Sequence, residues 1–367
     1  MALEVGAEIG GSRADRDRGE CVSTCAGGYR AANQSSPTER HMIITRTPLR
    51  ISLGGGGTDL ASYYEQHGGF VVAASIAKYV YIGINATFTH DYFLKYSALE
   101  RAEFVHEIDH PIMRVALTRH HVEPAVEIVS LADIPSGTGL GSSGSFTVGL
   151  LRAIHAYKRE HVTASDLAEE ACEIEVNQLG RSVGKQDQYI AAFGGLTCFA
   201  FEKNGAVKTS PLAITSETLH DLEDHLVMFF TGFSREADRV LADQKERTQA
   251  ADPSMINNLH EIKRIGIEVK DALEQGETER FGVLMDEHWQ LKRRRSEGMS
   301  NDAIDDWYAL ARTHGALGGK LVGAGAGGFL LFYAPEPARL RAGLIESGLN
   351  EVRFGFDHDG SIVLMRA

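Results

Sequence analysis

Two kinds of hydrophobic pattern alternate along the chain. Short runs rich in Val, Ile, Phe and Tyr predict strands, and longer stretches with apolar residues at helical spacing predict helices. The strand-like runs cover 43–47, 70–76, 80–86, 127–132 and 329–333, with strand and turn over 195–214 and a last strand at 361–365. The helical stretches cover 146–157, 165–179, 236–250, 255–274, 277–295 and 337–347. Because both kinds of element alternate in both halves, we expect a mixed α/β, or α+β, fold.

The same pattern predicts how the chain divides. Residues 1–41 are polar, rich in Gly, Ser and Arg and without apolar period, so we expect a disordered extension, with Met42 as a plausible true start. We expect a linker near 214–220 between an N-terminal domain, 42–205, and a C-terminal domain, 215–367. No apolar run reaches the roughly 18 residues of a membrane span, and the first residues lack the apolar centre of a signal peptide.

Charge and cysteine content narrow the class of protein. Lys and Arg number 37 against 50 Asp and Glu, a net charge of −13. Such an acidic chain lacks the broad basic face of a nucleic-acid binder, so cations that meet an anionic substrate must gather in a pocket. The four cysteines have no spacing typical of a disulfide framework, which favours a reducing compartment and a cytoplasmic protein. They are Cys21, Cys25, Cys172 and Cys198.

A glycine-rich loop at 137–144 stands directly before a predicted helix. Its glycines let the backbone approach a ligand, and the helix start offers free N–H donors and a positive dipole end. Ser142 and Ser143 add hydroxyls for phosphate oxygens or Mg²⁺. The loop lacks the Gly-Lys-Ser/Thr ending of the ordinary P-loop. A flexible loop with a serine helix cap is the structural alternative.

Three segments resemble the signatures of the galactokinase–homoserine kinase–mevalonate kinase (GHMP) superfamily, in the same order. Residues 48–59 resemble the galactokinase opening, 135–143 the second signature, and 318–328 the third. The resemblance implies a two-domain kinase with a C-terminal ferredoxin-like α+β domain. It also implies that the second signature wraps the phosphates of ATP and that the third braces it. The nucleotide-binding positions are then Pro135, Gly137, Thr138, Gly139, Leu140, Gly141, Ser142, Ser143 and Gly144.

The resemblance also supplies the groups for phosphoryl transfer. Residues 175–188 resemble a galactokinase run that contains two acids. Glu175, together with Ser143, would bind Mg²⁺ beside the phosphates, and Asp187 would contact the attacking hydroxyl. Arg50 would stand next to Asp187 and offset charge as the phosphoryl group transfers. A solvated helix face for Glu175 and a helix cap for Asp187 are the structural alternatives.

Within the superfamily the chain most resembles D-glycero-α-D-manno-heptose 7-phosphate kinases. Gly56 and Gly57 replace a Glu-His pair of galactokinases, which argues against galactose and predicts a roomier site. Asp59, on the same turn, can accept hydrogen bonds from sugar hydroxyls, or else cap a helix. The positions expected to bind the sugar phosphate are Gly56, Gly57, Thr58, Asp59, Lys185, Gln188, Arg235, Lys292 and Arg293.

The far phosphate of such a sugar needs a cationic partner. Four cations run unbroken from 292 to 295 at a helix end, where consecutive residues point about 100° apart. We expect Lys292 or Arg293, with Arg235 and Lys185, to receive the phosphate. Arg294 and Arg295 fit a solvated helix end equally well.

Other functions on the same fold remain open at this stage. An L-fucokinase- or galactokinase-like sugar 1-kinase is the nearest alternative, followed by a catalytically silent sugar sensor and a diphosphate decarboxylase of the superfamily. The partners implied by the first choice are a sugar phosphate and ATP, with no nucleic acid and no membrane. The chain would act as a monomer or homodimer.

Overall fold

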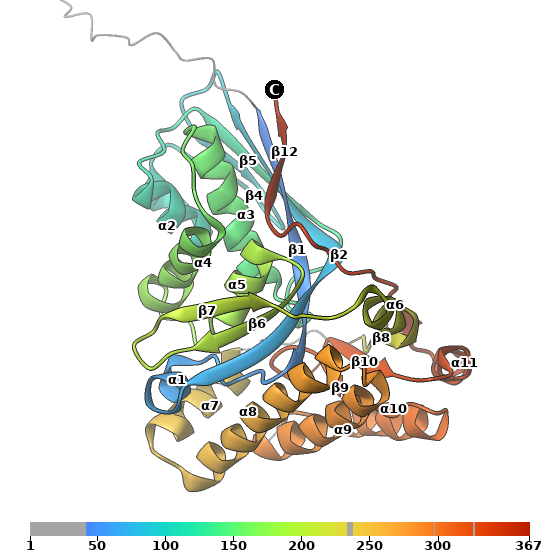
Figure 1. The fold of residues 1–367 in the computed structure, drawn as a ribbon. Helices are drawn as coiled ribbons and strands as arrows, with labels where there is room; N and C mark the ends of the chain where they lie inside the picture. The colour runs from blue at the N-terminus through green and yellow to red at the C-terminus, as the bar shows by residue number, and fades with distance from the viewer. Residues whose placement is uncertain (1–41, 233–237, 297, 326) are drawn as a thin grey trace, which may run out of the picture. The chain divides into compact units, whose positions relative to one another are not determined.

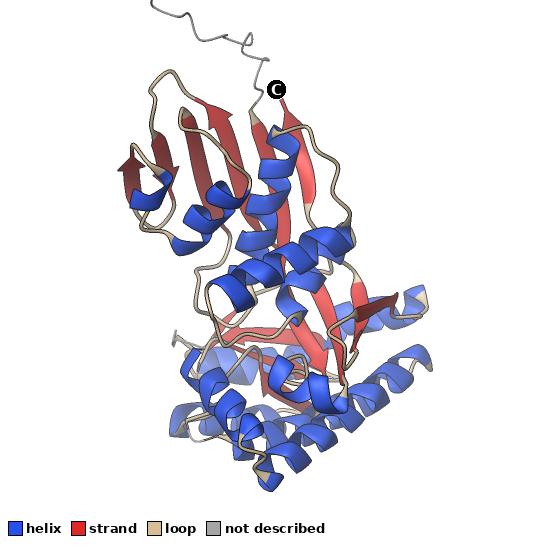
Figure 2. Cartoon of the chain, turned by 90° about the vertical axis from the view of Figure 1, so that its left-hand side faces the viewer, coloured by secondary structure: helices blue, strands red, loops and turns tan. Residues whose placement is uncertain are grey.

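The computed structural model describes residues 42–232, 238–296, 298–325 and 327–367. These residues belong to one compact unit of two β-sheets and the helices that cover them (Figures 1 and 2). The extension expected at 1–41 lies outside the described residues. Among the described helices, none combines the length and the apolar composition needed to cross a bilayer.

The larger sheet has the strand order β12-β1-β2-β5-β3-β4, with β6 paired to β2 and β7 to β6. All neighbours are antiparallel except β3 and β5, which run parallel. The strands are β1 (Ile43–Gly54), β2 (Gly69–Ala86), β3 (Tyr92–Lys95), β4 (Leu99–Ala102), β5 (Val126–Ala132), β6 (Leu196–Phe201), β7 (Val207–Pro211) and β12 (Ile362–Arg366). Because β2 is long, its first half pairs with β6 and its second half with β5.

Helices α3 and α5 pack on the larger sheet, and α2 and α4 pack in turn against these helices and the segment that follows α4 (Figure 1). Their bounds are α2 (Pro111–Arg119), α3 (Ser142–Tyr157), α4 (Ala164–Cys172) and α5 (Gln186–Phe193), while α1 (Ala61–His67) follows β1. In α3, Val148, Leu151 and Ile154 recur every three residues and are fully buried, so one apolar stripe fixes the helix on β1 and β2. After α4 the chain continues as a π-helical turn, Glu173–Gln178.

The smaller sheet, β11-β8-β10-β9, is antiparallel throughout. Its strands are β8 (Leu226–Phe230), β9 (Gly318–Leu321), β10 (Phe329–Tyr333) and β11 (Asn350–Glu351). The helices around it are α6 (Ser216–His225), α7 (Asp238–Gln249), α8 (Pro253–Glu274), α9 (Thr278–Arg295), α10 (Asp302–Thr313) and α11 (Pro337–Glu346). Helix α9 packs on β9 and β10 and beside α8, which in turn contacts β1 and β2.

The predicted mixed α/β fold is confirmed, with four differences in detail. The strands expected at 70–76 and 80–86 are one continuous strand, because both parts pair with β1 across a register shift. The expected linker at 214–220 contains the start of α6, which Thr215 caps by accepting a hydrogen bond from the N–H of Thr218. The helix expected over 165–179 becomes π-helical from residue 173. The last strand, β12, lies in the expected C-terminal domain but pairs with β1 in the larger sheet. The predicted domain limits, 42–205 and 215–367, stay predictions.

Candidate active site

One cavity of about 570 Å³ collects most of the segments singled out above. It is lined by β1 and the turn after it, the phosphate loop with the start of α3, the segment before α5, and the facing sides of α9 and β9. The lining residues that carry the argument below are Arg50, Gly57, Asp59, Ser143, Arg181, Asp187, His288, Lys292, Arg295 and Lys320.

The phosphate loop joins β5 to α3 and folds as the glycines require. Gly137, Gly139 and Gly141 have φ angles of 77°, 87° and 74°, a region in which side chains with a Cβ are strained. Gly141 precedes the first residue of α3, so the free N–H groups of that helix face the cavity at Ser142 and Ser143. The loop therefore offers the anion cradle that the sequence predicted.

Not every predicted nucleotide-binding residue lines the cavity. Ser136, an unpredicted member, lines it together with five of the predicted nine: Gly137, Gly139, Gly141, Ser142 and Ser143. Of the others, Leu140 belongs to the core, and Thr138 is buried with its hydroxyl bonded to the carbonyl of Pro135. Gly144 lies against Asp187, where a Cβ would come within 2.8 Å of that residue's Cβ. These positions support the loop from behind.

The third glycine-rich segment packs directly on the phosphate loop. A Cβ on Gly323 would lie 2.6 Å from the Cα of Gly139, and one on Gly328 would lie 2.0 Å from the carbonyl oxygen of Thr138. Only glycine permits such close approach of two backbones. The expected bracing of one loop by the other is therefore present.

Arg50 and Asp187 form a two-pronged ion pair at the centre of the cavity. The Nε of Arg50 donates to Oδ1 of Asp187 at 2.7 Å, and its Nη2 donates to Oδ2 at 2.8 Å. Nη1 of Arg50 donates to the carbonyl oxygen of Gly139 at 2.6 Å, which ties the pair to the phosphate loop. The Arg50 side chain is 5% exposed and that of Asp187 is 25% exposed, so the carboxylate remains accessible from the cavity.

Ser143 and Glu175, the predicted Mg²⁺ ligands, are hydrogen-bonded to each other. The Ser143 hydroxyl donates to Oε2 of Glu175 at 2.6 Å, and Gln188 donates to Oε1 at 3.1 Å. Glu175 lies within the π-helical turn, a feature frequent at functional sites. Gln188 is buried and does not line the cavity, so it positions Glu175 instead of contacting the sugar.

A hydroxyl and a carboxylate are the oxygen ligands that Mg²⁺ takes, so the donor set fits that ion. Arg181 shares the same oxygens: its Nη1 donates to the Ser143 hydroxyl at 2.6 Å and to Glu175 at 3.1 Å. The Arg181 side chain is 29% exposed and can release both oxygens toward solvent when a cation replaces it.

Asp59 is held in the turn that follows β1. Its Oδ1 accepts from the N–H of Gly57 at 3.0 Å, and its Oδ2 accepts from the N–H of Gln186 at 3.2 Å. Burial, and then the negative charge of Asp187, raise the pKa of Asp59 above its usual value. The next residue back, Thr58, is fully buried and its hydroxyl bonds backbone carbonyls, so it fixes the turn without reaching the cavity.

Four basic side chains from α9 and β9 reach the cavity. They are His288, Lys292, Arg295 and Lys320, all at least 95% buried. The first three are spaced four and three residues apart, so they share the inner face of α9. Lys292 donates to the carbonyl oxygens of Leu321 and Gly323. Among the described residues, Asp59 is the one anion whose charge affects the pKa values of these four side chains, and it acts on Arg295.

Burial disfavours the charged forms of these side chains and lowers their pKa values. Burial, and then the neighbouring Arg50, lower the pKa of Lys320 to about 7. Burial also lowers the pKa of Lys292 well below its usual value, with Arg295 the next largest cause. The Nζ of Lys320 lies 3.3 Å from Nδ1 of His288, so that nitrogen is the acceptor and Nε2 carries the hydrogen. That Nε2–H has no partner among the described residues.

Arg295 is the most unusual member of the group. Its guanidinium is 5% exposed, yet among the described residues Nε and Nη1 have no hydrogen-bond partner. A Cβ on Gly57 would lie 2.5 Å from Nη1 of Arg295 and 3.2 Å from Oε1 of Gln244. The space left by Gly57 is therefore occupied by Arg295, which corrects the expectation of a roomier site at that position.

Lys185 and Arg293, both expected to bind the sugar phosphate, do not line the cavity. Lys185 binds the carboxylate of Glu169 at 3.0 Å and the carbonyl oxygen of Gly205, and does not line the cavity. Arg293 points to the other side of α9 and pairs with Asp305 of α10 at 2.6 Å. Arg235 lies outside the described residues. For Arg295 the sequence left a solvated helix end as an equal alternative, although the 288–292–295 spacing places it on the same helix face as Lys292.

Comparison with known proteins identifies related chains. Two family descriptions match, the GHMP kinases N terminal domain over residues 98–195 and GHMP kinases C terminal over residues 269–348. The chain is 32% identical over 303 residues to the D-glycero-alpha-D-manno-heptose 7-phosphate kinase of Campylobacter jejuni, covering 79% of this chain and 89% of that protein.

Solved structures show the same fold. A D-glycero-D-manno-heptose 1-phosphate kinase from Bacteroides thetaiotaomicron matches with a TM-score of 0.73 at 26% identity, covering 88% of this chain and 99% of that one. The galactokinase of Lactococcus lactis, solved with galactose, matches with a TM-score of 0.70 at 18% identity, covering 88% and 94%. The second likeness concerns the fold alone.

Proposed function

Because the chain belongs to the GHMP kinases and is an ATP-dependent sugar kinase, we propose that its acceptor is a phosphorylated heptose. The reaction transfers the γ-phosphoryl group of ATP to the anomeric hydroxyl of D-glycero-D-manno-heptose 7-phosphate, and yields the 1,7-bisphosphate and ADP. Two relatives named as kinases of heptose phosphates support this acceptor. The bisphosphate would supply synthesis of nucleotide-activated heptose for surface polysaccharide, in the cytoplasm, where ATP is available.

In this proposal, Arg50 and Asp187 act at the anomeric hydroxyl. Both carboxylate oxygens of Asp187 accept from Arg50, and each keeps a further lone pair for the acceptor's O–H. Asp187 thus orients the oxygen for in-line attack on the γ-phosphorus, and the proton leaves through the carboxylate or the transferred group. Arg50, already bonded to the phosphate loop, stabilises the charge that develops on the phosphoryl oxygens.

Ser143 and Glu175 would hold the magnesium ion of Mg·ATP. Bound there, Mg²⁺ neutralises charge on the β- and γ-phosphates. The N–H groups at the start of α3 and the glycine backbone bind the remaining phosphate oxygens. Gln188 keeps the Glu175 carboxylate turned toward Ser143, so the two ligands stay together.

The observation that carries the choice of acceptor is the buried guanidinium of Arg295, of which Nε and Nη1 have no hydrogen-bond partner among the described residues. A buried charge without an anion costs several kcal/mol, and a ligand that supplies the anion recovers that cost. Arg295 lies against the turn that holds Asp59, the charge of Asp187 raises the pKa of Asp59, and all three side chains line the same cavity. A sugar that places its hydroxyl at Asp187 would therefore present its far phosphate to Arg295, with His288 Nε2–H as a second donor.

A free sugar such as galactose or fucose fits the cavity less well. Its hydroxyl groups could pair with the unbonded polar atoms of Ser52 and Gln186, which also line the cavity. Among the described residues it would nevertheless leave Lys292 and Lys320 without an anion, and Nε and Nη1 of Arg295 without a hydrogen-bond partner. We therefore place free-sugar kinase activity second.

A substrate panel tests the proposal. The chain is incubated with Mg·ATP and heptose 7-phosphate, heptose 1-phosphate, free heptose, galactose, fucose or mannose, and release of ADP is followed. Both heptose monophosphates give the same bisphosphate, so the measurement that distinguishes them is which monophosphate is consumed. We expect heptose 7-phosphate to have the highest kcat/KM. A preference for any free sugar, or for heptose 1-phosphate, would show the proposal to be wrong.

A further inference from the structure

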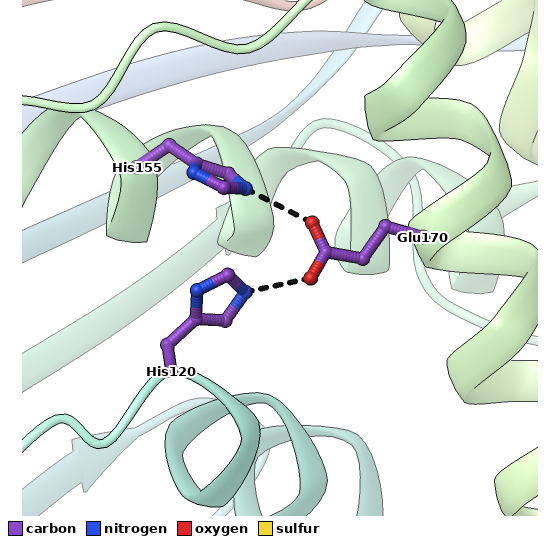
Figure 3. Close-up of side chains that lie close together, drawn as sticks. All are labelled: His120, His155 and Glu170. Carbon is purple, nitrogen blue, oxygen red and sulfur yellow. Dashed lines mark hydrogen bonds and ion pairs between the residues drawn. The ribbon is translucent and has the colours of Figure 1, made fainter.

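A second group of ionisable side chains lies away from the cavity, where α2, α3 and α4 meet. His120 follows the last residue of α2, His155 is in the last turn of α3, and Glu170 is in α4 (Figure 3). Their side chains are 9%, 14% and 12% exposed. The three residues have no part in the proposed kinase reaction.

The ligand atoms of this group converge. The Nε2 of His155 lies 2.9 Å from one carboxylate oxygen of Glu170, and the Nε2 of His120 lies 2.8 Å from the other. All three ligand atoms are within 4.8 Å of one another. Although Nε2 of His120 lies close to the Glu170 carboxylate, it has no hydrogen-bond partner among the described residues. Figure 3 shows both imidazoles facing the carboxylate from the same side, with the nitrogens turned toward it.

The surroundings of His155 favour a ligand role for its Nε2. Its Nδ1 lies 3.0 Å from Oε2 of Glu160, so a hydrogen on Nδ1 is fixed there, and loss of the proton that Nε2 shares with Glu170 leaves a lone pair on Nε2 for a metal. A carboxylate on the second ring nitrogen is the usual partner of a metal-binding histidine. The arrangement thus contains both the ligands and an orienting group.

We propose that His120, His155 and Glu170 form a Zn²⁺ site. Two imidazoles and one carboxylate are ligands that zinc prefers, whereas Mg²⁺ and Ca²⁺ take oxygen alone. Zinc replaces the proton shared between His155 and Glu170, and water completes four-coordination. The metal ties together α2, α3 and α4, two of which lead to the active site: α3 begins beside Ser143, and α4 continues into the turn that carries Glu175.

Arg119 is the group that competes with the metal. Its Nε donates to Oε1 of Glu170 at 2.9 Å, and its side chain is 41% exposed. Because so much of the side chain already meets solvent, it can turn away when zinc takes the carboxylate. Binding should therefore weaken as pH falls, by about tenfold per pH unit for each proton that zinc must displace.

Zinc binding by the full-length chain without a polyhistidine tag tests this site. Cys21 and Cys25 are replaced by serine in every sample, because thiolates also bind zinc. After removal of metal with a chelator, Zn²⁺ is titrated without nucleotide, and Co²⁺ absorption reports the coordination number. We expect one Zn²⁺ per chain, a rise in Tm with zinc, and four-coordinate Co²⁺. His155→Gln and Glu170→Gln should lower affinity by at least about tenfold.

His161→Gln is the matched control, because His161 is an exposed histidine outside the group. It should bind zinc like the parent chain, and all variants should keep their kinase activity in the absence of zinc. Less than stoichiometric binding by the parent chain would overturn the proposal. Equal binding by His155→Gln and the parent would do the same, and would place the zinc elsewhere. Since zinc affinity, Tm and Co²⁺ absorption decide the outcome, failure here is distinct from failure of the proposed reaction.

Discussion

The two ends of the active-site cavity differ in how their charged side chains are paired. At the phosphoryl-transfer end, Arg50 is paired with Asp187 and Arg181 with Glu175, so each guanidinium has a carboxylate within 3.1 Å. At the other end, Lys292 and Lys320 bond only to backbone carbonyls and a neutral imidazole, and two nitrogens of Arg295 have no partner among the described residues.

This difference separates a preformed site from an incomplete one. Paired charges hold their geometry before a ligand arrives, which suits groups that must be aligned for transfer. Unpaired buried charges destabilise the free protein and are satisfied only when an anion binds. In the proposed reaction, the unpaired charges at the acceptor end lower the stability of the free protein and favour an anionic substrate, whereas the paired charges at the transfer end do not distinguish one sugar from another.

The largest expected effect is at the paired end. Asp187→Asn keeps the shape of the side chain but removes the charge that meets Arg50 and the acceptor hydroxyl. We expect kcat to fall by at least about 10²-fold, the scale of a lost acid–base group. Steady-state kinetics with heptose 7-phosphate, and direct ATP binding, measure it. ATP affinity should change little, and a kcat close to that of the parent would show that Asp187 is structural.

The unpaired end should respond through substrate affinity. Arg295→Met removes the guanidinium with little loss of volume, and we expect KM for heptose 7-phosphate to rise about 10- to 100-fold. KM for ATP should stay nearly constant. Because an uncompensated buried charge is removed, Tm should be unchanged or higher.

Arg293→Met, two residues earlier, is the matched control for Arg295→Met. It breaks only a partly exposed ion pair with Asp305, which contributes at most about 1 kcal/mol to stability. Its kinetic constants should resemble those of the parent chain. If instead Arg293→Met raises KM for the sugar phosphate and Arg295→Met does not, the assignment of the anion partner is reversed.

A smaller effect is expected on metal dependence. Glu175→Gln removes one of the few protein ligands that Mg²⁺ would have, so more Mg²⁺ should be needed for half-maximal rate, by roughly tenfold. Titration of Mg²⁺ at fixed ATP measures this. The acceptor KM should not move in parallel, because Glu175 lies at the transfer end. Identical Mg²⁺ curves for variant and parent would remove Glu175 from the metal site.

The smallest expected effect is the pH dependence of stability at Lys320. Its pKa falls from an ordinary 10.5 to about 7 on folding, so between these values the unfolded chain binds the extra proton. Unfolding free energy should therefore rise with pH across that interval, relative to Lys320→Met, by at most about 1.4 kcal/mol per pH unit. Denaturant unfolding of both proteins at pH 7 and pH 9 measures the difference. A fall in the unfolding free energy of the parent with rising pH, relative to that of Lys320→Met, contradicts the assignment.

The transfer end could be predicted from the sequence because its groups lie in short ordered motifs. Arg50, Ser143, Glu175 and Asp187 were each assigned from a local pattern, and the structure brings them into two hydrogen-bonded pairs. Their roles in the reaction stay predictions. The glycine spacing of the phosphate loop also dictated its backbone, because three of its positions need positive φ angles.

The acceptor end could not be predicted as well, because its members meet only through tertiary packing. Lys185 stands two residues before Asp187 in sequence, but its ammonium pairs with Glu169 of α4 instead of facing the cavity. The run 292–295 names four cations, and only the rotation of α9 against β9 decides which of them face inward. Lys320 comes from β9 and donates to a backbone carbonyl of β1. No local sequence pattern predicts this contact.

The pairing of β12 with β1 can form only late in translation, because the two strands lie at opposite ends of the described sequence. Thr47, in the first strand, bonds Ser361 across 314 residues of sequence, and β12 covers the edge of β1 next to that contact. At about 5–20 residues per second, roughly 15 to 60 seconds of translation separate the two partners. Throughout that interval the emerging sheet displays an open edge, to which another nascent chain can add a strand. Slow elongation or crowded polysomes should therefore lower the yield of folded protein, even where the finished molecule is stable.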